Sequence, residues 1–343
     1  MGTLSDFFDP YLQQTWGNCQ GVVLSEASVT LPYPCEQVKA PLKKALAEHL
    51  GTPAEISLKS EILAHKTQAG VQPISNIKNI IAVASGKGGV GKSTTALNVA
   101  LALKAHGAKV GLLDADIHGP NQPGMLAHTG EKPEIIDKQF QPIEHFGLAT
   151  MSIGYLIDAE QPTIWRGPMV STALSQMLTD TAWPALDYLI VDMPPGTGDV
   201  QLTLSQKIPV SGAVIVTTPQ NVALQDAQKG LAMFKKVGIP VLGAVENMAY
   251  YHCPACGHDD AIFGQGGGER LAEQFSLPLL GRIPLNSTIR QGADEGKPAV
   301  LFADTAIQTA YLDTALQLAV KLSLQARAYA DKLLKIKVHH QQE

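Results

Sequence analysis

The sequence predicts an α/β fold with a doubly wound, mostly parallel sheet, preceded by a small α+β N-terminal domain. Five short runs are apolar throughout instead of alternating, which is typical of strands buried on both faces of a parallel sheet. Helical stretches lie between these runs, and such strand–helix alternation favours a doubly wound sheet. The chain has 343 residues, a length typical of about two domains. Of these residues 45% are hydrophobic and 17% charged, which is enough apolar material for a core.

The small domain is expected over residues 1–75, and residues 76–343 are expected to form the larger one. The stretch Gly70–Asn79 is polar and punctuated by glycine and proline, which is typical of a linker. Before it, residue spacing predicts strands and one helix that stops at Gly51. These elements are strands at Val22–Leu24, Ser28–Leu31 and Ala54–Leu58 and a helix at Glu36–Leu50.

The larger domain contains the five apolar runs and at least four amphipathic or apolar helical stretches. The strands are predicted at Ile80–Ala84, Lys109–Leu113, Tyr188–Val191, Ala213–Thr217 and Val241–Val245. The helices are predicted at Ser93–His106, Met169–Leu178, Val222–Val237 and Glu269–Phe275. Thr305 and Gln308 form a possible capping box before a long helix through roughly Lys335, in a region without glycine or proline.

A phosphate loop follows the first apolar run. It reads Gly-Lys-Gly-Gly-Val-Gly-Lys-Ser, and it lies between a predicted strand and a predicted helix, as such loops require. Glycines let backbone N–H groups approach phosphate oxygens, the second lysine can neutralise the β- and γ-phosphates, and the serine hydroxyl can ligate Mg²⁺. The sequence therefore predicts a P-loop NTPase fold whose nucleotide contacts are Gly86, Lys87, Gly88, Gly89, Val90, Gly91, Lys92, Ser93 and Thr94.

Aspartates follow two of the predicted strands, at the sheet edge where parallel folds bind ligands. Asp114 and Asp116 come directly after the second run, and Asp192 ends the third. A strand that ends in aspartate before a Gly-rich loop is the second acidic element of P-loop enzymes, so we expect Asp192 to hold Mg²⁺ through water. Taken singly, Asp114 and Asp116 are equally compatible with helix capping or turn formation.

A second candidate site is the cysteine pair Cys253 and Cys256. The two thiolates are spaced so that both can bind one soft metal ion. Four interpretations are open: a redox dithiol, a zinc site that also uses a neighbouring histidine, buried structural thiols, or half of an iron–sulfur site. Cluster ligation usually needs four thiolates, so the last interpretation requires the same pair from a second subunit. Cys19 and Cys35 lie in the small domain without chelating spacing and are expected to be structural.

The phosphate loop resembles the deviant loop of the MinD/ParA class of P-loop ATPases, in which an additional lysine reaches the partner subunit's nucleotide. The resemblance implies a homodimer that sandwiches ATP, with Lys87, Lys92 and Asp116 as catalytic residues. Asp116 would orient the attacking water and Asp114 would support it near Mg²⁺. Asn247, at the end of the fifth strand, would contact the adenine.

The motifs around Asp114, Asp192, Asn247 and Cys253 follow the order seen in the Mrp/ApbC family of iron–sulfur cluster carrier ATPases, over roughly Ile77–Ala303. This resemblance implies a cytoplasmic homodimer that binds a [4Fe–4S] cluster through Cys253 and Cys256 of both subunits. The cluster would be received from upstream scaffold proteins and transferred to apo-proteins. The small domain only loosely resembles a domain that these carriers share with other iron–sulfur assembly proteins.

Composition and charge disfavour some alternative partners of the protein. The net charge of −5 disfavours nucleic acid as a partner, and the sequence contains neither a secretory signal nor an apolar run of about 18 residues. We therefore expect a cytoplasmic protein without a membrane partner. The alternatives are a MinD/ParA-type positioning ATPase that binds membrane or DNA through the basic stretch at Lys332, Lys335 and Lys337, and a zinc-containing nucleotide switch. The cysteine pairs of two subunits can also bridge a [2Fe–2S] cluster.

Overall fold

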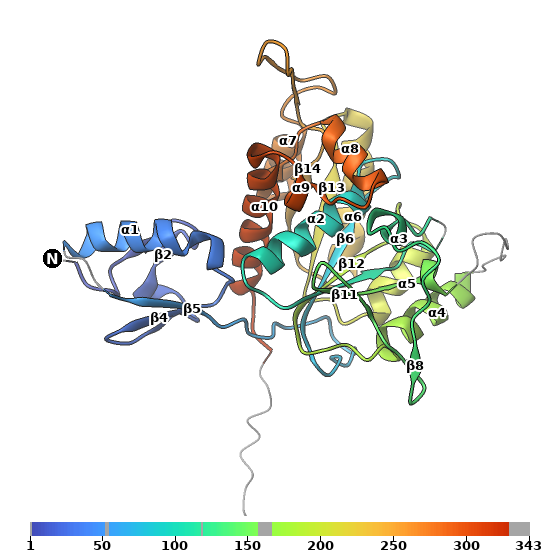
Figure 1. Cartoon of the computed structure of the whole chain (residues 1–343), viewed down its shortest axis with the longest axis horizontal. Coiled ribbons are helices and arrows are strands. Elements are labelled where there is room, and N and C mark those ends of the chain that lie inside the picture. Colours follow the sequence, from blue (N-terminus) through green and yellow to red (C-terminus); the bar gives the residue numbers. More distant parts are fainter. Residues whose placement is uncertain (1, 52–54, 118, 157–166, 329–343) are drawn as a thin grey trace, which may run out of the picture.

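The computed structural model describes residues 2–51, 55–117, 119–156 and 167–328. Its largest element is a sheet in which neighbouring strands run parallel, except for one antiparallel pair at an edge. The predicted doubly wound, mostly parallel sheet is therefore confirmed (Figure 1). In spatial order its strands are β10 (Ile143–His145), β11 (Leu148–Ser152), β7 (Val110–Asp114), β12 (Leu186–Asp192), β6 (Ile77–Ala84), β13 (Gly212–Thr217), β14 (Val241–Glu246) and β17 (Leu279–Arg282).

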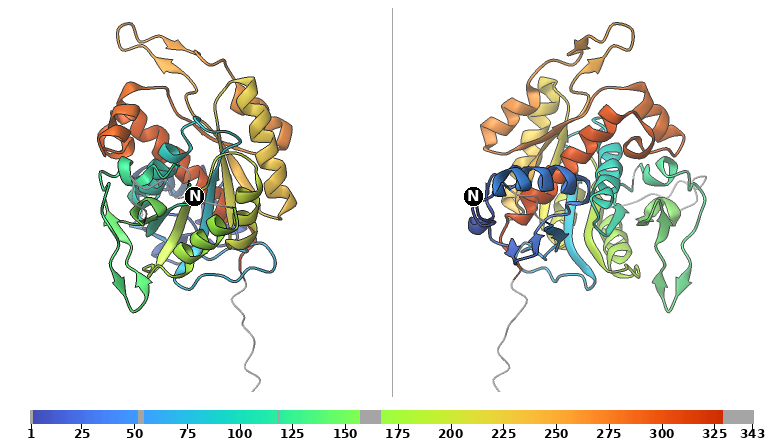
Figure 2. Two further views of the ribbon diagram at one scale, coloured as in Figure 1. Left: turned by 90° about the vertical axis from the view of Figure 1, so that its right-hand side faces the viewer. Right: turned by 60° about the vertical axis from the view of Figure 1, so that its left-hand side comes forward.

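Helices cover both faces of this sheet (Figures 1 and 2). Because side chains alternate along a strand, neighbouring residues of β6 enter different apolar cores. Ile81 and Val83 belong to the core that contains α2 and α10, whereas Ile80 and Ala82 belong to the core of α4, α5 and α6. The helices are α2 (Lys92–Ala105), α3 (Gln122–Met125), α4 (Gly167–Thr179), α5 (Asp199–Lys207), α6 (Asn221–Lys236), α7 (Gly267–Phe275), α8 (Ser287–Asp294), α9 (Ala299–Phe302) and α10 (Thr305–Ser323).

The carboxyl ends of β6, β7 and β12 lie together and position the candidate site. Asp192 is in register with Val83 on one side and with Asp114 on the other. The loop that follows β6 and the aspartates that end β7 and β12 therefore meet at one edge of the sheet, as expected for a parallel fold.

The N-terminal unit has its own sheet, made of β3 (Val23–Leu24), β4 (Ser28–Leu31) and β5 (Ser57–Ser60), together with α1 (Lys39–Leu50). Asp9 is buried within it and accepts hydrogen bonds from Trp16 Nε1 and Tyr33 Oη, both at 2.8 Å. The apolar core of this unit is continuous with the core around α2 and α10. The division into domains at residue 75 stays a prediction.

The first strand of the large sheet begins earlier than predicted. β6 starts at Ile77, so it includes residues that polarity had assigned to the linker. Asn79 is buried there: its Oδ1 accepts a hydrogen bond from the His65 backbone N–H at 3.0 Å, and its Nδ2 donates to the Leu63 carbonyl at 2.9 Å. A polar side chain with such partners can enter a core strand without the cost of an unsatisfied group.

The C-terminal helix is shorter than predicted. α10 ends at Ser323, and its N-cap is Asp304, whose side chain accepts from the Ile307 backbone N–H at 3.0 Å. The expected capping box at Thr305 and Gln308 is therefore wrong, because Thr305 is already helical. Beyond the helix, the backbone of Arg327 pairs with that of His65. Residues 329–343, including Lys332, Lys335 and Lys337, lie outside the described residues.

The other predicted elements are present, with ends that differ by a few residues; the strand expected at Ala54–Leu58 is observed at Ser57–Ser60. No sequence pattern predicted β10, β11, β17, α3, α5, α8 or α9. Among the described residues, no helix has the length and apolarity needed to cross a membrane.

Candidate functional site

The phosphate loop connects β6 to α2, and glycine is required in it for two different reasons. Gly89 and Gly91 have φ angles of +79° and +80°, in the left-handed region that favours glycine. A Cβ atom on Gly86 would lie 2.1 Å from the backbone of Asp226 in α6. By contrast, Cβ positions at Gly88 and Gly89 meet no atom within 4 Å. The loop is thus packed closely at its base and open at its tip, where a phosphate chain can approach.

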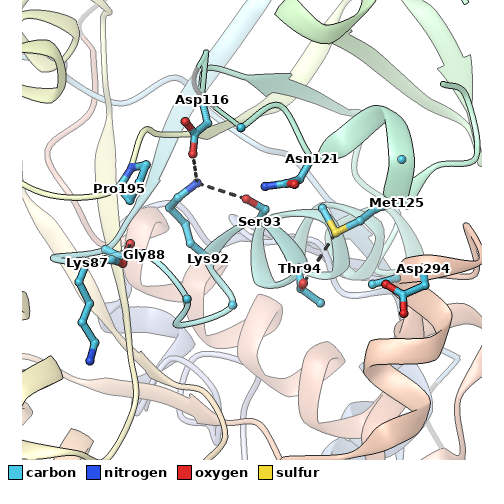
Figure 3. Close-up of a pocket in the computed structure, with 16 residues that line it drawn as sticks. Lys87, Gly88, Lys92, Ser93, Thr94, Asp116, Asn121, Met125, Pro195 and Asp294 are labelled. Carbon is cyan, nitrogen blue, oxygen red and sulfur yellow. Dashed lines mark hydrogen bonds and ion pairs between the residues drawn. The ribbon is translucent and has the colours of Figure 1, made fainter. Parts of the chain in front are cut away.

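A cavity of about 650 Å³ opens over this loop, a size suited to a small-molecule ligand. The phosphate loop forms one wall, Asp116 and Asn121 come from the loop after β7, and Pro195 comes from the loop after β12 (Figure 3). The far end is lined by Met125 of α3 and Asp294 of α8 (Figure 3). The predicted loop contacts from Lys87 to Thr94 border the cavity, except Val90, which is buried beneath it.

Lys92 lies between the charged side chains of the site. Its ammonium group lies 2.5 Å from Asp192 Oδ1 and 3.9 Å from Asp116 Oδ2, and it donates to Ser93 Oγ at 3.3 Å. The side chain of Lys92 is only 6% exposed and that of Asp192 is fully buried. This cation is therefore paired with Asp116, predicted to orient the attacking water, and with Asp192, predicted to hold Mg²⁺ (Figure 3 shows Asp116).

Asp114 is buried behind the cavity wall. Its Oδ1 accepts the Asp116 backbone N–H at 3.1 Å, and its Oδ2 accepts the Gln122 backbone N–H at 3.1 Å and the Ser152 hydroxyl at 3.0 Å. Burial, and after it the neighbouring charge of Asp192, raise the pKa of Asp114 well above its usual range. These contacts tie Asp114 to the loop that carries Asp116, so its observed contacts hold the loop in shape.

Two other predicted residues flank the loop on different sides. Lys87 is partly exposed, and Figure 3 shows its side chain extending away from Lys92. Asn247, at the end of β14, is buried and its Nδ2 donates to the Val90 carbonyl at 2.9 Å. Asn247 therefore supports the phosphate loop from below, and its predicted contact with adenine stays a prediction.

The residues around the cavity fit a magnesium nucleotide. Ser93 Oγ and the Asp116 carboxylate supply hard oxygen donors at the surface of the site, and Asp192 lies directly behind them. The open loop at Gly88 and Gly89 offers the backbone cradle that phosphates need.

The sequence analysis missed Gln122, the first residue of α3. Its backbone N–H donates to Asp114 Oδ2 at 3.1 Å, and its side-chain Nε2 donates to Asp192 Oδ2 at 2.9 Å. Gln122 lies within the motif that begins at Asp114, but its role could not be predicted, because residues 93, 114 and 192 meet only in the folded chain.

The cysteine pair lies on a two-stranded ribbon formed by β15 (Tyr251–His252) and β16 (Asp259–Asp260). Figures 1 and 2 show this ribbon projecting from the body of the molecule, beyond β14. The Cys253 backbone N–H donates to the His258 carbonyl at 2.9 Å, and Gly257 N–H donates to the Cys253 carbonyl at 2.9 Å. Cys256 is exposed and Cys253 is partly exposed. Both thiols are therefore available at the end of a protruding turn.

The local surroundings of the two thiols favour ligation of a metal by the thiolate. Backbone N–H groups of Cys256 and Ala255 donate to the Cys253 sulfur, which lowers its pKa, and the Cys256 thiol adds a further hydrogen bond. His252 Nδ1 instead pairs with Asp259 Oδ1 at 2.7 Å. Among the described residues, no group of three or more histidine, cysteine or acidic side chains is arranged to hold a metal ion.

The four cysteines are expected to differ in reactivity in the native metal-free protein. Iodoacetamide should modify Cys253 faster than an unperturbed thiol near pH 7, because its lowered pKa gives more thiolate. Cys19 and Cys35 should stay unmodified, since both are buried and burial raises their pKa values. Mass spectrometry of peptides checks this, with protein alkylated in denaturant as the control. Equal labelling of Cys19 and Cys253 in the native protein would contradict it.

Comparison with known proteins gives consistent matches. The family model described as NUBPL iron-transfer P-loop NTPase matches residues 76–319. An iron-sulfur cluster carrier protein of Pseudomonas fragi is 57% identical over 250 residues, which cover 72% of this chain and 87% of that protein. Another carrier, from Haemophilus influenzae, is 47% identical over 311 residues, covering 89% and 84%. A nucleotide-binding protein from Archaeoglobus fulgidus, solved in complex with ADP, is 36% identical with a TM-score of 0.58 and covers 65% of this chain and 88% of its own.

Proposed function

The chain belongs to the NUBPL iron-transfer family of P-loop NTPases, and we propose that it is an ATP-hydrolysing iron–sulfur cluster carrier. In this proposal a homodimer binds a [4Fe–4S] cluster through Cys253 and Cys256 of both subunits, receives it from a scaffold protein and transfers it to apo-proteins. The single observation that carries the proposal is the exposed cysteine pair on a ribbon attached to a phosphate-binding P-loop domain.

The nucleotide half of the proposal rests on the arrangement around Lys92. A phosphate chain in the cradle would give this ammonium group a new anionic partner, so Lys92 would turn from Asp192 toward the β- and γ-phosphates. Mg²⁺, when bound, neutralises charge on the phosphate oxygens, and Ser93, Asp114 and Asp192 are the proposed residues that hold it. Asp116, which lines the cavity, would orient the attacking water.

Lys87 supports a homodimer as the active form. Its side chain extends away from Lys92 (Figure 3), so its ammonium group is free to approach a phosphate outside its own subunit. A cation delivered from a second subunit would stabilise charge that develops during phosphoryl transfer. In this arrangement hydrolysis requires two chains, as does completion of the cysteine ligand set.

The cluster half of the proposal rests on the ribbon. Each chain offers two thiols, and a two-fold axis would bring together the four thiolates that a cubane cluster requires. Backbone N–H groups donate to the Cys253 sulfur, and such hydrogen bonds stabilise thiolate ligands and tune cluster potential. Exposure of both cysteines suits a cargo that must leave for an acceptor. The carrier relatives favour this function over a positioning ATPase or a zinc switch.

Transfer to an acceptor tests the proposal. Protein reconstituted anaerobically with iron and sulfide should restore activity to the apo form of a [4Fe–4S] dehydratase, and transfer should outpace that from free iron and sulfide when a chelator is present. The metal-free protein is the control. The proposal fails if the reconstituted protein gives no more activity than this control.

A further inference from the structure

We propose that Gln122 is a positioning residue of the magnesium–nucleotide site, which keeps Asp192 in place when Lys92 turns to the phosphates. The inference rests on the proposed function and adds a residue to it. Gln122 begins α3, directly after the loop that carries Asp116, and it is 1% exposed. Its side-chain and backbone N–H groups together contact three separate parts of the site.

The contacts of Gln122 connect both acidic strands to the start of α2. Its backbone N–H donates to Asp114 Oδ2 at 3.1 Å, at the end of β7. Its side-chain Nε2 donates to Asp192 Oδ2 at 2.9 Å, at the end of β12, and to the Ser93 carbonyl at 3.1 Å, in the first turn of α2. A single residue therefore fixes the spacing between the groups proposed to hold Mg²⁺.

The orientation of the side-chain amide follows from its partners. A carboxylate oxygen and a backbone carbonyl can only accept, so the nitrogen rather than the oxygen must face Asp192 and Ser93. Both hydrogens of Nε2 are then in use. The remaining atom, Oε1, is buried and has no hydrogen-bond partner among the residues that the structure describes, which is costly for a polar atom away from water.

The unpartnered oxygen belongs to the amide whose nitrogen contacts Asp192, one of the proposed magnesium ligands. Nitrogen and oxygen of one amide are about 2.3 Å apart, so Oε1 is close to the Asp192 carboxylate that Nε2 contacts. Mg²⁺ in such sites keeps several of its waters, and a water there would supply the donor that Oε1 lacks.

The same contacts explain how Asp192 stays oriented through the exchange of partners. Lys92 holds Oδ1 of this carboxylate and Gln122 holds Oδ2. When Lys92 moves to a phosphate, the bond from Gln122 remains, and the buried Asp192 does not lose all of its donors. Replacing a residue that supports metal ligands in this way commonly lowers metal affinity 10- to 100-fold.

The test compares nucleotide affinity in Mg²⁺ with that in EDTA, using calorimetry with ADP on the full chain. In wild type we expect Mg²⁺ to tighten binding. We call the ratio of ADP affinity in Mg²⁺ to that in EDTA the gain. In Gln122→Met and Gln122→Leu this gain should be about tenfold smaller than in wild type. The ADP affinity of both variants in EDTA should stay within about twofold of the wild-type value. Gln68 is the matched control: it is also a buried glutamine, and it bonds the backbone of Ser205, Ile208 and Val210. Gln68→Met should keep the full gain.

The outcomes separate this inference from the proposed function. An unchanged gain in both Gln122 variants would overturn the inference alone. Loss of affinity in EDTA as large as in Mg²⁺ would also overturn it, because Gln122 would then support the fold of the loop and not the magnesium site. Absence of any nucleotide binding, or of any gain from Mg²⁺, in wild type would instead contradict the proposed nucleotide site.

Discussion

Replacing Lys92 by alanine is expected to weaken ATP binding about a hundredfold or more. The ammonium group is the phosphate partner in the proposed complex, and hydrogen bonds to charged groups contribute about 1.5–3 kcal/mol each. The variant also leaves the fully buried Asp192 with Gln122 as its remaining side-chain donor, so the free energy of unfolding should fall by roughly 3 kcal/mol. Calorimetry with ATP and thermal unfolding measure the two effects.

Lys87→Ala is the matched variant, since it removes a lysine from the same loop. Lys87 is partly exposed and extends away from Lys92, so its loss should leave stability unchanged and ATP affinity within about twofold. Hydrolysis should nevertheless be lost if Lys87 acts across the dimer. ATP binding to Lys92→Ala as tight as to wild type would show that the phosphate loop does not bind nucleotide in the proposed way.

Loss of either Cys253 or Cys256 is expected to abolish stable cluster binding. Each substitution removes two of the four thiolates from a two-fold symmetric site, so iron and sulfide retained after desalting should fall to near background. ATP affinity should not change, because neither cysteine lines the cavity over the phosphate loop. Ultraviolet–visible spectra and metal analysis of reconstituted Cys253→Ala and Cys256→Ala proteins check this.

Cys19→Ala provides the control within the same chain. Cys19 is buried in the N-terminal unit, so this substitution should leave the spectrum of the reconstituted protein unchanged. Full cluster occupancy in Cys253→Ala would contradict the assignment of the ligands, whatever its effect on transfer.

The parts of the fold that were predictable from the sequence are those with strong local patterns. β6 and β12 are buried on both faces, so their apolar runs stand out, and the glycines of the phosphate loop are required by local geometry. The edge strands were missed for the opposite reason. β10 is short and only partly buried, and β17 includes glycine and arginine, which weaken a strand pattern.

The remaining errors arise where distant segments determine local structure. Polarity assigns Asn79 to the linker, whereas in the folded chain His65 and Leu63 supply its hydrogen bonds and it belongs to β6. The region after Ser323 lacks glycine and proline, so the sequence does not mark the end of α10, and the backbone pairing of Arg327 with His65 lies just beyond it. The role of Gln122 in the site was missed for the same reason, since its hydrogen-bond partners come from three different elements.

In the proposed function, two chains share one iron–sulfur cluster through the cysteine ribbon. Iron, acid-labile sulfide and zinc should be measured on anaerobically reconstituted protein whose mass in solution is determined in the same sample. We expect a dimer that is brown, absorbs near ~400 nm and holds one [4Fe–4S] cluster per two chains. A colourless protein with bound zinc, or a cluster retained on a single chain, would contradict it.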